Sequence, residues 1–162
     1  MVNDIATIIT AIVAVTGLFL SVYNFYIDRR DKIPRLAVKL YGGVHTHGQR
    51  LGPYMAFMEA ANIGEKMVKI TGIEIKWRNM TVFFPDGIRG DKTIPFELQP
   101  GDNAVFFYPA VDIASALKGR GGGGEEKIRA RFRTAVGREF VSDPISIDID
   151  GLANSVNGDD AI

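Results

Sequence analysis

The sequence predicts a mainly β protein: one antiparallel β-sandwich domain behind a single N-terminal transmembrane helix, with one short helix inside the domain. Two observations lead to this prediction. Residues 5–27 carry no charged side chain, and short apolar stretches beyond them alternate with glycine, proline and asparagine turn signals. The second pattern is typical of a domain built from short antiparallel strands.

The composition fits this organisation and excludes several classes of function. The chain has 162 residues with 19 Lys plus Arg and 19 Asp plus Glu, so no net charge draws it to nucleic acid. It has no cysteine, which excludes disulfides, thiolate catalysis and zinc ribbons. We expect a transmembrane helix over residues 1–27, a juxtamembrane linker over 28–34, the β domain over 35–150 and a disordered tail over 151–162.

The uncharged run IATIITAIVAVTGLFLSVYNFYI is long enough to cross a bilayer. As a helix it would reach roughly 34 Å, against about 30 Å for the hydrocarbon core. Tyr23 and Tyr26 stand near its end, where amphipathic rings favour the headgroup layer. A cleavable signal peptide needs a basic start and a small-residue cleavage site, whereas this segment begins with MVND and ends in YNFY. The sequence therefore favours an uncleaved anchor in the cell membrane.

The basic residues that flank this helix predict its orientation. No Lys or Arg precedes it, and Arg29, Arg30 and Lys32 follow it directly. Basic flanks remain on the cytoplasmic side of a membrane, and acidic residues count for little. We therefore expect a single-pass protein with its N-terminus outside and its β domain in the cytoplasm.

Small and polar residues form one heptad seam along the helix. They recur at alternating spacings of three and four, at Asn3, Thr7, Thr10, Ala14, Gly17, Ser21 and Asn24. Lipid gives no hydrophobic drive for helices to associate, so small residues that permit close packing and hydrogen bonds matter most. The seam predicts packing against copies of itself or against another membrane protein. The alternative is that such residues are simply common in membrane helices.

The remaining chain reads as a series of strands. RLAVKLY alternates as a half-buried strand, and YMAFMEAAN is apolar on both faces, as in a central strand. The alternation slips at Gly72, which predicts a bulge. With a short helix over about 111–117 and strands on both sides of it, we expect an immunoglobulin-like antiparallel β-sandwich, with a small barrel as the alternative.

Two turn motifs carry a resemblance to known proteins. The first is an Asn-x-Gly turn before a V-x-I-x-x-I-x-I strand, at Asn62, Gly64, Val68, Ile70, Ile73 and Ile75; the second is Leu98, Pro100, Gly101 and Asp102 before an apolar strand. Over residues 5–150 the chain resembles uncharacterised bacterial single-pass membrane proteins with a C-terminal immunoglobulin-like domain. The resemblance implies the fold and no catalytic residues, and the cysteine pair and tyrosine corner of antibody domains are missing.

One predicted strand carries a row of cations. Lys127, Arg129, Arg131 and Arg133 alternate with apolar residues, so all four face one way. They could form a basic interaction face toward anionic lipid or an acidic partner. The alternative is neutralisation by Asp148 and Asp150 on a neighbouring strand, and the sequence favours this second interpretation.

No motif predicts catalysis, a metal or a cofactor. GRGGGGEEK, residues 119–127, follows a helix and contains two glutamates, unlike a phosphate-binding loop. His45 and His47 have no third ligand nearby in sequence. We therefore expect a non-enzyme: an accessory or scaffolding subunit of a membrane complex, whose partners are membrane lipid and other transmembrane helices. The alternative is a membrane-tethered module that captures a soluble protein or ligand.

Overall fold

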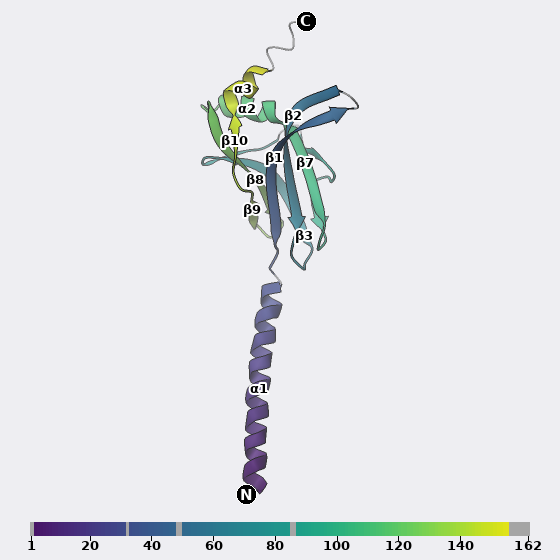
Figure 1. Cartoon of the computed structure of the whole chain (residues 1–162), viewed down its shortest axis with the longest axis vertical. Coiled ribbons are helices and arrows are strands. Elements are labelled where there is room, and N and C mark those ends of the chain that lie inside the picture. The colour runs from purple at the N-terminus through teal and green to yellow at the C-terminus, as the bar shows by residue number, and fades with distance from the viewer. Residues whose placement is uncertain (1, 32, 48–49, 85–86, 156–162) are drawn as a thin grey trace.

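The computed structural model describes residues 2–31, 33–47, 50–84 and 87–155. A long helix, α1 (Val2–Asp31), leads into a domain of two antiparallel sheets (Figure 1). The predictions of a mainly β chain, antiparallel pairing and an N-terminal apolar helix are confirmed.

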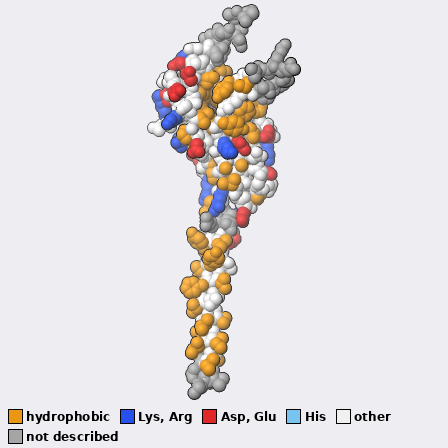
Figure 2. Space-filling view, in the orientation of Figure 1, with side chains coloured by type: hydrophobic (Ala, Val, Ile, Leu, Met, Phe, Trp, Pro, Cys, Tyr) orange, Lys and Arg blue, Asp and Glu red, His pale blue; other side chains and the backbone are white. Residues whose placement is uncertain are grey.

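Helix α1 is exposed from Ile5 to Asp28. Its segment Ile5–Asp28 has a mean hydropathy of 2.4, is long and apolar enough to cross a membrane, and has none of its length buried inside the protein. Hydrophobic side chains cover it, whereas charged side chains gather on the domain (Figure 2). The helix continues to Asp31 and so takes up part of residues 28–34, where the sequence predicted a linker.

The first sheet has four strands, in the order β1 (Leu36–His47), β2 (Arg50–Asn62), β7 (Asn103–Pro109) and β5 (Arg89–Gly90). Strand β2 lies between two neighbours, as its apolar character on both faces predicted. On the inner face Met58 and Ala60 are fully buried. On the outer face Phe57 stacks on Tyr41 of β1 with 5.5 Å between ring centroids.

The second sheet has six strands. Its main order is β10 (Ile145–Asp148), β8 (Glu125–Thr134), β3 (Val68–Trp77) and β4 (Met80–Val82), while β6 (Phe96–Leu98) also pairs with β3 and β9 (Glu139–Val141) with β8. The register of β3 against β8 shifts between Ile70 and Gly72, which confirms the predicted bulge. Beyond the shift, Ile73, Ile75 and Trp77 are buried in the core.

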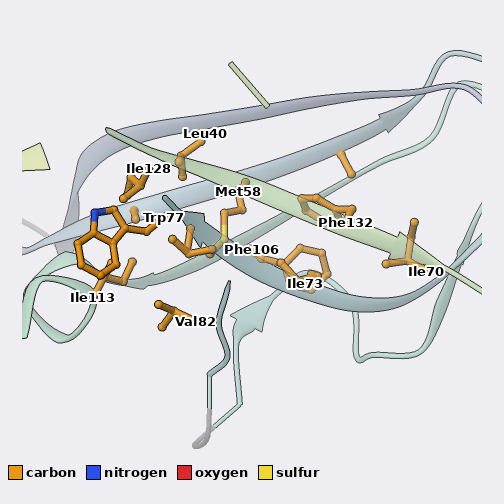
Figure 3. Packing of buried hydrophobic residues seen from close by; sticks show 14 of the residues in the cluster. Leu40, Met58, Ile70, Ile73, Trp77, Val82, Phe106, Ile113, Ile128 and Phe132 are labelled. Atoms are coloured by element: carbon orange, nitrogen blue, oxygen red, sulfur yellow. The ribbon is translucent and has the colours of Figure 1, made fainter. Parts of the chain in front are cut away.

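One hydrophobic core joins the two sheets (Figure 3). Phe106 of the first sheet lies between Phe96 and Phe132 of the second, at centroid distances of 5.2 and 6.2 Å. Trp77 is fully buried in the same core. Such rings remove large apolar areas from water, and each fully buried side chain contributes about 1.5–3 kcal/mol.

The two ends of the domain differ. We call the end next to α1 the near end; it holds the start of β1, and through the pairing Leu36–Asn62 the end of β2. The bond from the Ala135 amide to the Lys69 carbonyl, 2.9 Å, brings the β8–β9 turn to the same end. The opposite, far end carries two helices, α2 (Ala110–Lys118) and α3 (Ile149–Ser155) (Figure 1).

The C-terminal segment departs from the prediction. Helix α2 matches the expected short helix, but the strand predicted to reach residue 150 ends at Asp148, and residues 149–155 form α3 instead of a strand end and a disordered tail. The cause is tertiary packing: Ile149 is fully buried, and its amide donates to the Gly124 carbonyl at 2.9 Å. Residues 156–162 lie outside the described residues.

Candidate functional site

The seam on α1 remains open in the structure. Thr7, Thr10, Ala14, Gly17, Ser21 and Asn24 are all exposed. A Cβ added at Gly17 would meet nothing within 4 Å, so nothing described in this chain requires glycine there. Glycine inside a helix costs about 0.8–1 kcal/mol relative to alanine. In a membrane helix, small residues permit the close approach of another helix.

Two threonines of α1 make the same local hydrogen bond but lie on different sides of the helix. The Thr10 hydroxyl donates to the Ala6 carbonyl at 2.9 Å, and the Thr16 hydroxyl donates to the Ile12 carbonyl at 2.8 Å. Both hydroxyls are therefore satisfied within the helix, which lowers the cost of placing them in lipid. Thr10 belongs to the seam and Thr16 lies outside it, so the pair can separate the effect of the seam from that of threonine itself.

The residues that predict orientation fall outside what the structure describes in detail. Arg29 and Arg30 lie in the last turn of α1, but their side chains are not described, and Lys32 lies outside the described residues.

The four cations of β8 divide into two pairs. Arg131 and Arg133, toward the near end, form ion pairs with Glu74 of β3, and Arg131 also binds Glu139 of β9 at 3.2 Å. Lys127 and Arg129, toward the far end, form no ion pair with any residue that the structure describes. The four side chains share one face, but only half of the predicted basic face is free for a partner.

Glu74 is the centre of the neutralised half. It lies directly opposite Arg131 in the β3–β8 register, and its side chain is only 1% exposed because the two arginine side chains cover it. Arg131 additionally donates to the Thr81 hydroxyl of β4 at 2.7 Å. Charged hydrogen bonds of this kind offset the desolvation of the buried carboxylate. The cluster ties β3, β4, β8 and β9 together.

The predicted acidic partners are therefore the wrong ones. Strand β10 does lie beside β8, but Asp148 stands opposite Glu125 and not opposite a cation. Asp150 lies in α3 and forms its ion pair with Lys118 of α2 at 3.1 Å. The sequence correctly placed the neighbouring strand, but the register and the turn into α3 direct its carboxylates elsewhere.

The free half of the basic face lines a shallow hollow of about 630 Å³ on the outer face of the second sheet. Cations outnumber anions in its lining, which consists of Lys76, Arg78, Lys127, Arg129, Glu125, Glu126 and Val141. Glu126 is occupied, because it pairs with Arg78 and accepts the Trp77 indole N–H at 3.1 Å. The surface is thus suited to acidic groups.

Sequence reasoning missed two of the cations that line this hollow. Lys76 faces Arg129 across the β3–β8 pair, and Arg78 occupies the turn between β3 and β4 with φ of 50°. The alternation around Ile75 and Trp77 could have placed Lys76 on the outer face. Only the register brings it opposite Arg129.

The glycine-rich segment connects α2 to β8 and contacts α3 at the far end. The Gly124 amide donates to the Asp150 carboxylate at 2.7 Å. That hydrogen bond, together with Lys118, lowers the pKa of Asp150. A Cβ at Gly122 would lie 2.8 Å from Cδ1 of Ile149, so glycine permits the close approach of α3. The Gly124 amide of this loop therefore binds a carboxylate of the same chain.

The predicted absence of metal and catalytic sites stays a prediction. Among the side chains that the structure describes, no three His, Asp or Glu residues lie close enough together to hold a metal ion. The side chains of His45 and His47, in the part of β1 toward the far end, are outside that description.

Comparisons with known proteins assign no family to this chain. A scan against protein-family models finds no match to the chain, and a search of curated proteins finds none either.

Proposed function

We propose that this protein is a non-enzymatic accessory or scaffolding subunit of a membrane protein complex, anchored by α1 and packed through its seam against other helices. The observation that carries the proposal is the open small-residue seam around Gly17, next to a domain whose core is complete without the helix. A helix serving only as a tether has no need of a glycine on that face.

The energetics favour helix association at this seam. Within lipid, helices gain from close contact and interhelical hydrogen bonds, and small residues allow the backbones to approach. The larger residues of α1, such as Ile12, Leu18 and Phe19, are exposed and suited to contact lipid chains. The same helix therefore has one side for lipid and one side for a partner helix.

Thr10→Leu combined with Gly17→Leu should abolish the assembly, because the two added side chains hold the partner helix away from the seam. The measurement is the mass and composition of the protein extracted from its native membrane in mild detergent. We expect the unmodified protein to emerge with a stoichiometric second protein or as a homo-oligomer, and the double variant to emerge alone.

Thr16→Leu is the matched control, because it removes the same local hydrogen bond and adds the same side chain outside the seam. It should leave the assembly intact. A lone monomer from the unmodified protein, or a loss of assembly in Thr16→Leu as large as in the double variant, would contradict the packing proposal.

We further propose that the domain lies in the cytoplasm and the N-terminus outside. The support is the Lys/Arg asymmetry, with none before α1 and Arg29, Arg30 and Lys32 at its end. A C-terminal reporter that is active only in the cytoplasm should be active. Activity of a reporter that works only outside would reverse the orientation.

The alternative proposal is a membrane-tethered binding module. It is favoured by the hollow beside Lys76, Lys127 and Arg129, which offers cations without ion-pair partners among the described residues. The occupant best suited to it is an acidic segment of a soluble protein. Extraction as a monomer would favour this alternative, because a tethered module needs no partner helix.

For the domain itself, we propose the immunoglobulin-like type of sandwich. Two antiparallel sheets around a single core support it, as do the turn motifs at Asn62 and Pro100.

A further inference from the structure

The near end of the domain exposes apolar side chains at its loop tips. Ile63 is 65% exposed and Met67 47% in the β2–β3 loop, and Val136 is 73% exposed in the β8–β9 turn. Val136 is at least as exposed as any large apolar side chain of α1 between Ile5 and Ile27. Single exposed apolar residues are ordinary on a protein surface. Three of them on neighbouring loops at one end of the domain form an apolar patch, which is typical of an interaction surface.

Chain connectivity places these loops next to the anchor. The Ile63 amide donates to the Arg35 carbonyl at 3.1 Å. Arg35 follows the end of α1 at Asp31 by four residues, which can span at most roughly 14 Å. If Asp28 stands at the edge of the hydrocarbon core, Asp31 lies about 5 Å beyond it, within the headgroup layer. The loops are thus within reach of the bilayer.

The β2–β3 loop is held in shape by a buried side chain. Asn62 is 1% exposed, and its amide donates to the carbonyls of Lys66 and Leu98 at 2.7 and 3.0 Å. Its side-chain oxygen accepts the Gly64 amide at 3.0 Å. With these bonds made inside the loop, Ile63 and Met67 are left facing outward. The exposed tips are therefore fixed features of the fold.

Both cations and carboxylates are exposed around these tips. The exposed cations of this end are Arg35, Lys66, Lys69 and Arg138, and the exposed carboxylates are Glu65, Glu97, Asp102 and Glu139. Glu97 lies opposite Lys69 in the β3–β6 register, and Glu139 forms an ion pair with Arg131. Asp102 is already paired with Lys92 at 3.8 Å. Basic side chains are visible on the domain just beyond its junction with α1 (Figure 2). Apolar tips with exposed cations near them fit the headgroup layer of a membrane, where apolar side chains can enter and cations can meet phosphate groups.

We propose that the near-end loops, with Ile63, Met67 and Val136 at their tips, enter the headgroup layer of the bilayer that α1 spans. The domain is then seated on the membrane with its far end, including the basic hollow, directed away from it. This inference rests on the proposed membrane anchoring of α1. It adds a second membrane contact that fixes the tilt of the domain.

The absence of cysteine allows a direct test. Three single-cysteine variants of the full chain, Val136→Cys, Ser115→Cys and Val13→Cys, each carry an environment-sensitive fluorophore in vesicles of phosphatidylcholine and phosphatidylglycerol. Ser115 is the matched control, because it is exposed on α2 at the far end. Quenchers attached to lipid at the headgroup or at mid-chain depth then report the depth of each label.

We expect the label at Val136 to shift to the blue and to be quenched from the headgroup depth, the label at Ser115 to be unquenched, and the label at Val13 to be quenched from mid-chain depth. Quenching at Val13 with none at Val136 would overturn the seated domain while leaving the anchor in place. No quenching at Val13 would overturn the anchor, and with it this inference. Equal quenching at Val136 and Ser115 would also overturn it.

Discussion

Replacing Arg131 by Met should destabilise the domain by about 3 kcal/mol, the low end of the range for removing one partner of a buried ion pair. The variant leaves Glu74, whose side chain is 1% exposed, with Arg133 as its only cation, and Arg133 is itself 43% exposed. It also removes the hydrogen bond to Thr81 and the ion pair with Glu139. Met keeps the apolar bulk of the arginine stem. The decrease in the free energy of unfolding therefore reports the lost charge and hydrogen bonds more than lost packing.

The measurement is urea unfolding of the full chain in detergent, followed by the fluorescence of Trp77, which is the only tryptophan and fully buried. Arg129→Met is the matched control on the same strand and face, and it should change the free energy of unfolding by less than about 0.5 kcal/mol. Adding Glu74→Met to Arg131→Met should recover part of the loss, because no carboxylate then stays buried. Equal effects of the two single arginine variants would contradict the assignment of Glu74 as the buried centre.

Phe106→Ala should cost about 3–5 kcal/mol, as for other large aromatic residues truncated in a core. Phe106 is fully buried and contacts Phe96 and Phe132 across the two sheets, so its loss leaves a cavity at the point where the sheets meet. The fluorescence of Trp77 during urea unfolding again provides the measurement.

Phe107→Ala tests which face of β7 points into the core. Phe107 is the next residue on the same strand and points to the outer face, where its ring lies 6.1 Å from Phe57 and is only partly buried. Its loss should cost clearly less than that of Phe106, because the site can collapse or fill with water. A larger effect at Phe107 than at Phe106 would mean that the strand faces the other way.

Local patterns predicted the elements of this fold well. The alternation in β1, the apolar β2, the slip at Gly72 and the short helix expected over about 111–117 all depend on residues close together in sequence. Each reflects a backbone preference or a period of two that acts within a few residues. The length and apolar character of α1 are of the same kind.

The candidate site was predicted only in part. The four cations of β8 were placed on one face, because alternation alone decides that. Their partners were not predicted, since Glu74 and Lys76 belong to β3, some fifty residues earlier in the chain. Which carboxylate meets which arginine depends on strand register, which no local pattern of charges specifies.

The sequence by itself determined an apolar N-terminal helix long enough to span a membrane, its seam of small residues, a series of antiparallel strands, and the absence of cysteine chemistry. Only the tertiary structure decided that β6 and β7, joined by the turn at Pro100 and Gly101, belong to different sheets. It also decided that residues 149–155 form a helix, and that Ile63, Met67 and Val136 lie at the end of the domain next to α1. The physical reason is that these outcomes depend on burial and register between segments distant in sequence, whereas periodicity and turn chemistry act within a single segment.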